Sequence, residues 1–192
     1  LDTGRDGKEL ERGSGGVPFF GKKNIGSNRR IRTFSACVAE VSNSERGEIT
    51  KEDTKIMNIT VYLGANEGND PALRKSVREL GHWIGSDGNS LVYGGSKTGL
   101  MGEIAQSVLD AGGKVTGVEP QFFMDEGFQY DGLTELIVTK DMAERKTKLI
   151  ELGDAFIAFP GGTGTLEEIA EVMSKVSLKQ LTAPCILYNL NG

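Results

Sequence analysis

The chain has 192 residues, of which 38% are hydrophobic and 26% are charged, values that suit a globular domain with a workable core. Its net charge of −5 argues against general nucleic-acid binding, because such binding requires a basic face that neutralises phosphates. No stretch approaches the ~18–20 uninterrupted apolar residues that a membrane-spanning helix needs, and no signal-peptide pattern opens the sequence. We therefore expect neither a nucleic acid nor a membrane as a partner.

The cysteine and histidine content is low. Cys37 and Cys185 lie far apart and form no CxxC pair, and a disulfide framework or a zinc site would need more cysteines. His82 is the only histidine, and we expect it to be structural or exposed on a helix beside Trp83. The sequence thus predicts no metal site, no histidine-based catalysis, and reduced thiols in a cytoplasmic protein.

Residues 1–56 differ in composition from the rest of the chain. They carry eleven lysines and arginines against nine acidic residues, whereas the remaining residues carry eleven against eighteen. Glycines are scattered among these charges, and no apolar period persists. We expect a disordered leader or a non-native extension, with an ordered arm packed on the domain as the alternative. The natural protein is then expected to begin at or near Met57, and the domain to cover residues 57–192.

From Met57 onward, apolar runs alternate with one-sided amphipathic segments. A strand at 59–63 is followed by a helix near 71–85, for which Asp70 and Pro71 are a favourable N-cap and first residue. The elements expected after it are a strand at 90–93, a helix near 99–111, a strand at 114–118, an irregular stretch at 119–133, a strand at 135–139, a helix near 142–152 capped by Asp141, a strand at 154–159, a helix near 165–177 and a strand at 184–188.

Strands that are almost entirely apolar and alternate with helices indicate a parallel sheet that is covered on both faces. The fold class expected is therefore α/β, a Rossmann-like doubly wound parallel sheet with helices on both faces. The sequence stops directly after a strand, whereas an open α/β sheet normally continues into a helix that covers that strand. We accordingly expect a truncation at the C-terminus.

The most distinctive turn is Pro160-Gly161-Gly162-Thr163-Gly164-Thr165, between an expected strand and an expected helix. Open parallel sheets bind ligands at such turns. The three glycines allow the backbone to approach an anion without an intervening Cβ, the two threonines offer hydroxyl donors, and the helix start adds N–H groups without an intrahelical acceptor. We expect this turn to bind a nucleotide phosphate; the alternative is a tight turn with a purely structural role.

A second glycine-rich turn, 94–102, matches neither of the familiar nucleotide-binding patterns. A dinucleotide fingerprint would need glycine where Ser96 stands, and a P-loop would need lysine and a hydroxyl residue where Leu100 and Met101 stand. Glu119 follows at the end of the next strand, where a dinucleotide fold places its ribose-binding acid. An NAD-type oxidoreductase therefore remains an open alternative.

Four charged residues stand at the starts of two helices. Arg145 and Lys146 lie in the first turns of one helix, where the helix dipole disfavours cations, so we expect them to face an anionic group; for Lys146 a solvated surface position is the alternative. Glu167 and Glu168 begin the helix behind the phosphate turn. One of these carboxylates is expected to complement the helix dipole, and the other to face the sugar.

Together these motifs resemble those of the LONELY GUY (LOG) family, often labelled lysine-decarboxylase-like. The family pattern PGGxGTxxE corresponds to residues 160–168, GGGxxGLMG to 94–102, and MHERK to 142–146. The similarity covers about 135 residues, from Asn58 to the end of the chain. The family pattern is altered at Ser96, Glu119, Ala143, Thr163 and Met173.

The resemblance implies a homodimer that hydrolyses the N-glycosidic bond of nucleoside 5′-monophosphates, either AMP or cytokinin nucleotides, to a free base and ribose 5-phosphate. It implies Arg145 and Glu168 as the catalytic pair. The residues implied in substrate or phosphate binding are Gly95, Glu126 (the nearest acidic candidate for a base contact), Lys146, Gly161, Gly162, Thr163, Gly164 and Thr165.

Residue chemistry agrees with this reaction. Cleavage of a ribosyl bond develops oxocarbenium character at C1′, which the carboxylate of Glu168 could stabilise while it orients or deprotonates water. Arg145 is always protonated at neutral pH and suits a fixed positive clamp better than a proton donor. No lysine stands in a setting suited to pyridoxal phosphate, and we expect no cofactor. A non-catalytic nucleotide-binding or carrier protein on the same fold is the alternative.

Overall fold

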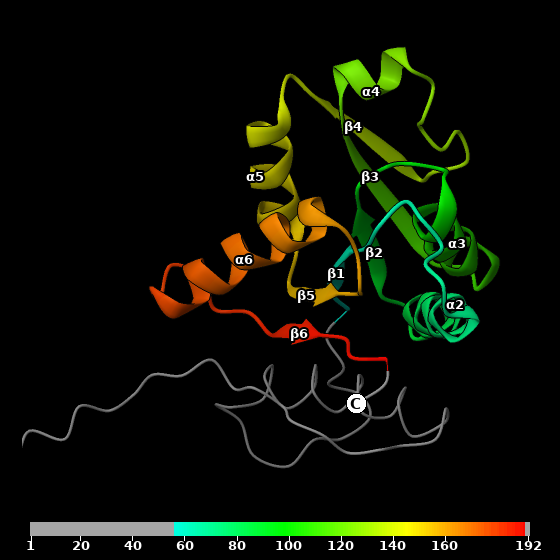
Figure 1. Cartoon of the computed structure of the whole chain (residues 1–192), viewed down its shortest axis with the longest axis horizontal. Helices are drawn as coiled ribbons and strands as arrows, with labels where there is room; N and C mark the ends of the chain where they lie inside the picture. Colours follow the sequence, from blue (N-terminus) through cyan, green and yellow to red (C-terminus); the bar gives the residue numbers. More distant parts are fainter. Residues whose placement is uncertain (1–55, 191–192) are drawn as a thin grey trace, which may run out of the picture.

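The computed structural model describes residues 56–190 (Figure 1). Apart from Ile56, the segment expected to be a leader lies outside the described residues. The elements in chain order are β1 (Asn58–Tyr62), α2 (Pro71–Ser86), β2 (Ser90–Tyr93), α3 (Gly99–Asp110), β3 (Lys114–Pro120), α4 (Gln121–Asp125), β4 (Glu135–Thr139), α5 (Met142–Leu152), β5 (Ala155–Ala158), α6 (Thr163–Ser177) and β6 (Cys185–Leu187).

The six strands form one parallel sheet in the order β4-β3-β2-β1-β5-β6. The chain proceeds outward from β1 to β4 and then crosses back to place β5 on the other side of β1. The strand order therefore reverses between β1 and β5, and such a switch point opens a crevice at the carboxyl ends of the two strands. The expected α/β doubly wound fold is confirmed.

Two helical layers cover the sheet, with α2 and α3 on one face and α5 and α6 on the other (Figure 1). The alternation along β1 explains why both layers are apolar. Ile59 and Val61 belong to the core cluster under α2 and α3, whereas Tyr62 belongs to the cluster under α5 and α6. Because the side chains of a central parallel strand meet one helix layer or the other, residues 59–62 of β1 are all buried, and Thr60 donates its hydroxyl to the Leu149 carbonyl oxygen of α5.

The helix starts that the sequence indicated are formed as expected. The Asp70 side chain accepts a hydrogen bond from the Ala72 N–H at 2.9 Å, and the Asp141 side chain accepts one from the Glu144 N–H at 2.8 Å. The close packing of α2 on α3 requires small residues, because a Cβ at Gly85 would stand 2.6 Å from the Val108 carbonyl oxygen. His82 is exposed on α2.

Most expected boundaries agree to within one residue, and three differences are larger or of another kind. β3 continues to Pro120, so Glu119 belongs to the sheet and pairs in register with Val138. The stretch expected to be irregular contains the short helix α4. α6 begins at Thr163 and not at residue 165, with Gly162 as its N-cap. Glycine and threonine have low helix propensity, and this is why the sequence alone does not reveal that they form the first turn of α6.

None of the described helices is long and apolar enough to cross a membrane.

Candidate active site

A cleft of about 330 Å³ lies where the sheet order reverses, at the carboxyl ends of β1 and β5. Backbone from the loop after β1 and from the start of α6 forms one part of its wall, and charged side chains of α5 and α6 form another. Apolar side chains complete it. From Gly64 onward along the chain, the residues that line the cleft are Gly64, Ala65, Asn66, Gly94, Met101, Phe123, Met142, Arg145, Lys146, Gly162, Thr163, Gly164, Thr165, Glu167 and Glu168.

The start of α6 presents backbone N–H groups to this cleft. The first helical hydrogen bond runs from the Leu166 N–H to the Gly162 carbonyl oxygen at 3.1 Å, so the N–H groups of residues 163–165 precede it. These groups have no acceptor within the helix, and the positive end of the helix dipole lies beside them. A Cβ at Gly162 or Gly164 would meet no atom within 4 Å. Both glycines therefore leave open space over donors that suit an anion.

Gly161 has a different role from the other two glycines of the turn. A Cβ there would stand 2.4 Å from Thr165 Oγ1 and 3.1 Å from the Gly64 nitrogen. Gly161 is also absent from the residues that line the cleft. Its lack of a side chain thus allows the loops after β1 and β5 to pack together, which is the structural role considered as the alternative for this turn. A phosphate contact of Gly161 stays a prediction.

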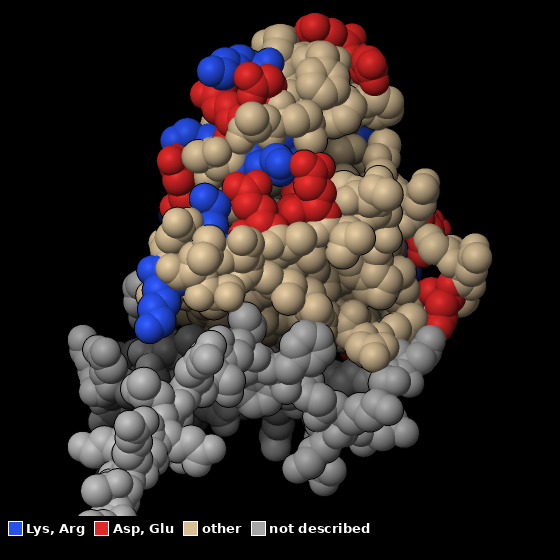
Figure 2. All heavy atoms as spheres, turned by 60° about the vertical axis from the view of Figure 1, so that its left-hand side comes forward, with Lys and Arg blue, Asp and Glu red and all other residues tan. Residues whose placement is uncertain are grey.

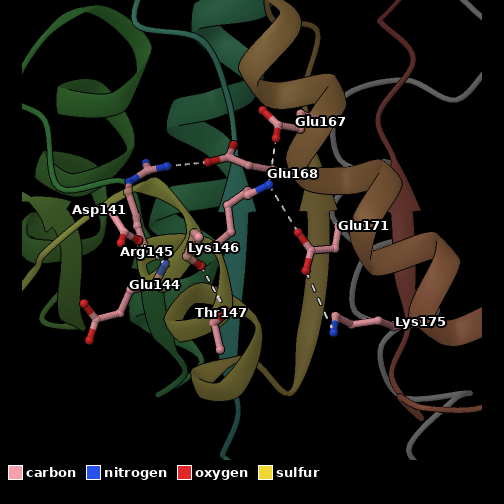
Figure 3. A network of polar contacts seen from close by, with 10 residues as sticks. Asp141, Glu144, Arg145, Lys146, Thr147, Glu167, Glu168, Glu171 and Lys175 are labelled. Carbon is pink, nitrogen blue, oxygen red and sulfur yellow. Dashed lines mark hydrogen bonds and ion pairs between the residues drawn. The ribbon is translucent and has the colours of Figure 1, made fainter.

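Arg145 is the buried cation of the site, with 7% of its surface exposed. Its Nε donates a hydrogen bond to the Val118 carbonyl oxygen of β3 at 2.9 Å, and its Nη1 donates to Glu168 Oε1 of α6 at 2.6 Å (Figure 3). A Cβ at Gly94 would lie 2.4 Å from Arg145 Nη2 and 2.4 Å from the Met101 methyl carbon. The guanidinium is therefore held between three elements, and the glycine at position 94 makes room for it.

Glu168 faces Arg145 across the cleft wall with a side chain that is 12% exposed. Burial raises the pKa of Glu168, and the positive charge and hydrogen bond of Arg145 offset this only in part. A carboxylate with a raised pKa is a stronger base than an exposed glutamate. The pair therefore combines a fixed positive charge with a proton acceptor at the same wall of the cleft.

Lys146 lies at the rim and also points toward α6 (Figure 3). Its Nζ is 2.7 Å from Glu167 Oε1 and 3.5 Å from Glu171 Oε2. The anionic groups expected opposite the two cations of α5 are thus present, and they are carboxylates of α6. A phosphate contact of Lys146 stays a prediction.

The surface around this region carries charges of both signs side by side (Figure 2). No broad basic patch is visible on that face, in agreement with the acidic balance of residues 57–192. Positive potential for a phosphate must therefore be local and come from oriented N–H groups and single cations.

Two residues assigned to the site lie elsewhere. Glu126 is exposed at the end of α4 and does not line the cleft. Gly95 is buried behind the wall with φ +91°, where its ideal Cβ would lie 3.1 Å from the Glu119 Cβ; Gly94 lines the cleft instead. Substrate contacts of Gly95 and Glu126 remain predictions that this geometry does not favour.

Sequence reasoning missed two parts of the cleft wall, the loop 64–66 and Phe123 of α4. The loop follows the central strand β1, and a Cβ at Gly99 would lie 1.5 Å from the Ala65 carbonyl oxygen. Gly99 thus fixes the loop against α3 by a contact that only glycine permits. A glycine directly after the first strand was the available signal for the loop; nothing in the sequence marked Phe123.

Several known proteins have sequences similar to this chain. A family described as "Possible lysine decarboxylase" matches residues 101–192. A cytokinin riboside 5′-monophosphate phosphoribohydrolase of Rhodococcoides fascians is 44% identical over 135 residues, which are 69% of this chain and 68% of that protein. The chain belongs to this phosphoribohydrolase (LOG) family.

Plant members of the LOG family are also similar. LOG1 of Arabidopsis thaliana is 38% identical over 140 residues, which are 73% of this chain and 66% of that protein. LOGL1 of Oryza sativa subsp. japonica is 41% identical over 134 residues, which are 70% of this chain and 60% of that protein. The chain thus spans between 60% and 68% of the length of these three relatives.

Solved structures confirm the fold. A molybdenum cofactor binding protein from Rippkaea orientalis superposes with a TM-score of 0.56 at 26% identity and covers 72% of this chain and 80% of its own. A molybdenum cofactor carrier protein from Chlamydomonas reinhardtii has a TM-score of 0.54 at 25% identity and covers 69% and 76%. The LOG-family chain therefore shares its architecture with proteins named for cofactor binding and carriage.

Proposed function

We propose that this chain hydrolyses the N-glycosidic bond of nucleoside 5′-monophosphates, AMP or cytokinin nucleotides, to a free base and ribose 5-phosphate. The observation that carries the proposal is the buried Arg145–Glu168 ion pair in the wall of the cleft that the start of α6 also lines. The names of the similar phosphoribohydrolases support the same reaction.

The start of α6 is proposed to bind the 5′-phosphate. The N–H groups of residues 163–165 and the dipole of a 15-residue helix point to one place, and the open space over Gly162 and Gly164 allows an oxygen to approach. With the phosphate held there, the ribose would extend along the wall toward Glu168. The phosphate then acts as a handle that positions the bond to be cleaved.

Glu168 is proposed to act on C1′ and on water. As the bond between C1′ and the base nitrogen breaks, its electron pair leaves with the base and positive charge develops on the ribose, which the carboxylate stabilises. The carboxylate also accepts a proton from the water that forms the new C1′–O bond. The departing base takes up a proton from solvent, to which Glu168 later returns its own, so that the sum of the steps adds one water across the cleaved bond. Arg145 holds the carboxylate in place through a hydrogen bond and cannot itself supply a proton.

The proposal is tested by incubating the protein with AMP or with an isoprenoid-adenine 5′-monophosphate. Chromatography then measures the free base and the ribose 5-phosphate that are released. The Glu168→Gln variant keeps the shape and removes the charge, and we expect its kcat to fall by ~10²–10⁴-fold. Glu151→Gln, an exposed carboxyl on α5 paired with Lys148, is the matched control and should retain activity. No release from either nucleotide, or equal rates in Glu168→Gln, would overturn the proposal.

A non-catalytic carrier is the second candidate, since cofactor carriers share the fold. A carrier would bind AMP without releasing adenine, and the loss of Glu168 would leave its affinity for ligand largely intact. The placement of Glu168 against a buried arginine in the cleft wall favours hydrolysis over carriage.

The assembly and the extent of the domain are also proposals. The resemblance to the LOG family supports a cytoplasmic homodimer in which residues 57–192 form the nucleotide-binding domain. Light scattering on the full chain and on residues 57–192 alone tests both points. A monomeric mass for the full chain would contradict the dimer, and failure of the shorter piece to fold would contradict the domain boundary.

A further inference from the structure

Glu119 is a buried carboxyl that the proposed reaction does not use. It stands near the end of β3 with 1% of its surface exposed, and its Oε2 has no hydrogen-bond partner within the described part of the chain. A buried acceptor without a donor is costly, and more so when it carries a charge. A buried carboxyl without a donor, directly behind the wall of a cleft, therefore suggests a functional role.

Glu119 follows the residue of β3 that holds the guanidinium of Arg145, and its carboxyl lies in the field of that cation. The carbonyl of the preceding residue, Val118, accepts the hydrogen bond from Arg145 Nε. Across the cleft wall, Arg145 Nη2 lies against Gly94, and the Glu119 Cβ and Oε2 lie 3.1 Å and 3.3 Å from the ideal Cβ position of Gly95. Of two consecutive glycines, Gly94 thus makes room for the cation and Gly95 for the second carboxyl.

The charged and titratable groups around Glu119 come from three elements. Burial raises the pKa of Glu119, and the charges of Arg145 on α5 and then of Lys97 in the β2–α3 turn oppose this without cancelling it. From β2, Tyr93 lies in the field of Glu119, while its own hydroxyl donates to the Ser96 carbonyl oxygen. Glu119 therefore keeps its proton at a pH where an exposed glutamate has lost it.

We propose that Glu119 is a positioning residue for Arg145. While Glu119 is protonated, the guanidinium of Arg145 pairs with Glu168 alone. Once Glu119 is ionised, it competes with Glu168 for the guanidinium. The inference rests on the proposed hydrolase function. In the protonated state the group of three side chains is neutral overall, and in the ionised state it carries one net negative charge. The second state draws Arg145 away from Glu168 and also disfavours an anionic substrate.

The first test is the pH dependence of AMP hydrolysis in the wild type and in Glu119→Gln, which keeps the shape and cannot ionise. We expect kcat of the wild type to fall by about threefold or more toward alkaline pH, on a limb that Glu119→Gln lacks. Glu135→Gln, an exposed carboxyl on the adjacent strand β4, is the matched control and should follow the wild type. Identical profiles for the wild type and Glu119→Gln would overturn the inference.

The second test needs no turnover. The Nε–H resonance of Arg145, assigned by its loss in Arg145→Lys, should shift with pH in the wild-type protein as Glu119 ionises, and should not shift in Glu119→Gln. A resonance that stays constant from pH 5 to pH 9 would contradict the coupling. If neither nucleotide is cleaved, the proposed function fails, whereas an active enzyme with a constant Arg145 resonance refutes only the role of Glu119.

Discussion

At the scale of single residues, Arg145 shows why the site requires a guanidinium. Nε donates to a carbonyl of β3 while Nη1 donates to a carboxylate of α6. Because both nitrogens belong to one planar guanidinium, the directions of these two N–H bonds are fixed relative to each other. A lysine carries the same charge on one nitrogen and cannot reach both acceptors in that geometry. The buried position removes water as a substitute partner.

Arg145→Lys should therefore lower both activity and stability. The ammonium loses the bond to the Val118 carbonyl, at a cost of about 1–3 kcal/mol in the free energy of unfolding. Because Glu168 is no longer oriented, kcat should fall on the order of 10²-fold. Urea unfolding and steady-state kinetics measure the two effects, and Lys148→Arg, in a surface ion pair of α5, is the control. Wild-type kcat in Arg145→Lys would show that charge alone suffices.

At the scale of the element, the glycines just before α6 and in its first turn have two different roles. Gly161 packs against Thr165 and the loop after β1, whereas Gly164 is a helical residue whose missing Cβ opens onto the cleft. The same substitution should thus have opposite effects on stability at positions only three residues apart.

Gly164→Ala should stabilise the fold by up to about 1 kcal/mol, since alanine favours a helix over glycine. The added methyl group points into the space proposed for the phosphate, so KM for AMP should rise several-fold. Gly161→Ala should instead lower the melting temperature, because its Cβ would stand 2.4 Å from Thr165 Oγ1. Thermal unfolding and kinetics of both variants check this, and equal stability changes would contradict it.

The contact between α2 and α3 supplies a pH-dependent link between elements. Burial would raise the pKa of Glu103 on α3, but hydrogen bonds from Arg78 and Arg74 of α2 hold it below its ordinary value of 4.5. A carboxyl with a lowered pKa contributes stability above the ordinary value, and this is lost as pH falls through the lowered one.

Glu103→Gln should therefore be less stable than the wild type near pH 7 and approach it as pH falls below 4.5. Melting temperatures at several pH values from 3 to 7 measure the difference. Glu79→Gln, whose carboxylate pairs with Lys75 on the outer surface of α2, is the control and should show little change. A difference that grows toward acid pH would have the wrong sign and contradict the account.

At the scale of the whole molecule, the cleft exists because the strand order reverses between β1 and β5. Its wall unites the loop 64–66 after β1 with the starts of α5 and α6, which follow that loop by more than seventy residues along the chain. A ligand bound there contacts segments from both sides of the switch point and should stabilise the folded state as a unit.

AMP at a hundredfold excess over Kd should raise the free energy of unfolding of inactive Glu168→Gln by about 2.7 kcal/mol. Its melting temperature should rise accordingly. Adenosine, which lacks the phosphate, should give a much smaller shift because the start of α6 then has no anion to bind. Differential scanning calorimetry with both compounds checks this. Equal shifts from AMP and adenosine would place the binding energy on the base and not on the phosphate.

Much of the fold could be predicted because the signals are local. The strands at 90–93 and 135–139 and the helix at 142–152 have the expected bounds, and both N-caps form as their residue types indicated. The start of α6 was misplaced because threonine and glycine are weak helix formers, and tertiary packing of Thr165 outweighs that preference. Part of the site could be predicted as well, because the glycine-rich turn at 160–165 is a contiguous motif and therefore a local signal.

The sequence by itself determined the alternation of strands and helices, and with it the doubly wound class and the glycine-rich turn at 160–165. It could do so because periodicity and turn chemistry act over a few residues. Only the tertiary structure decided that Arg145 meets Glu168, that Lys146 meets Glu167, and that Glu119 is buried near the end of β3. These contacts depend on the order of strands in the sheet and on which face each helix covers. Such long-range geometry leaves no periodic trace in the chain, and so the site had to be read from the fold.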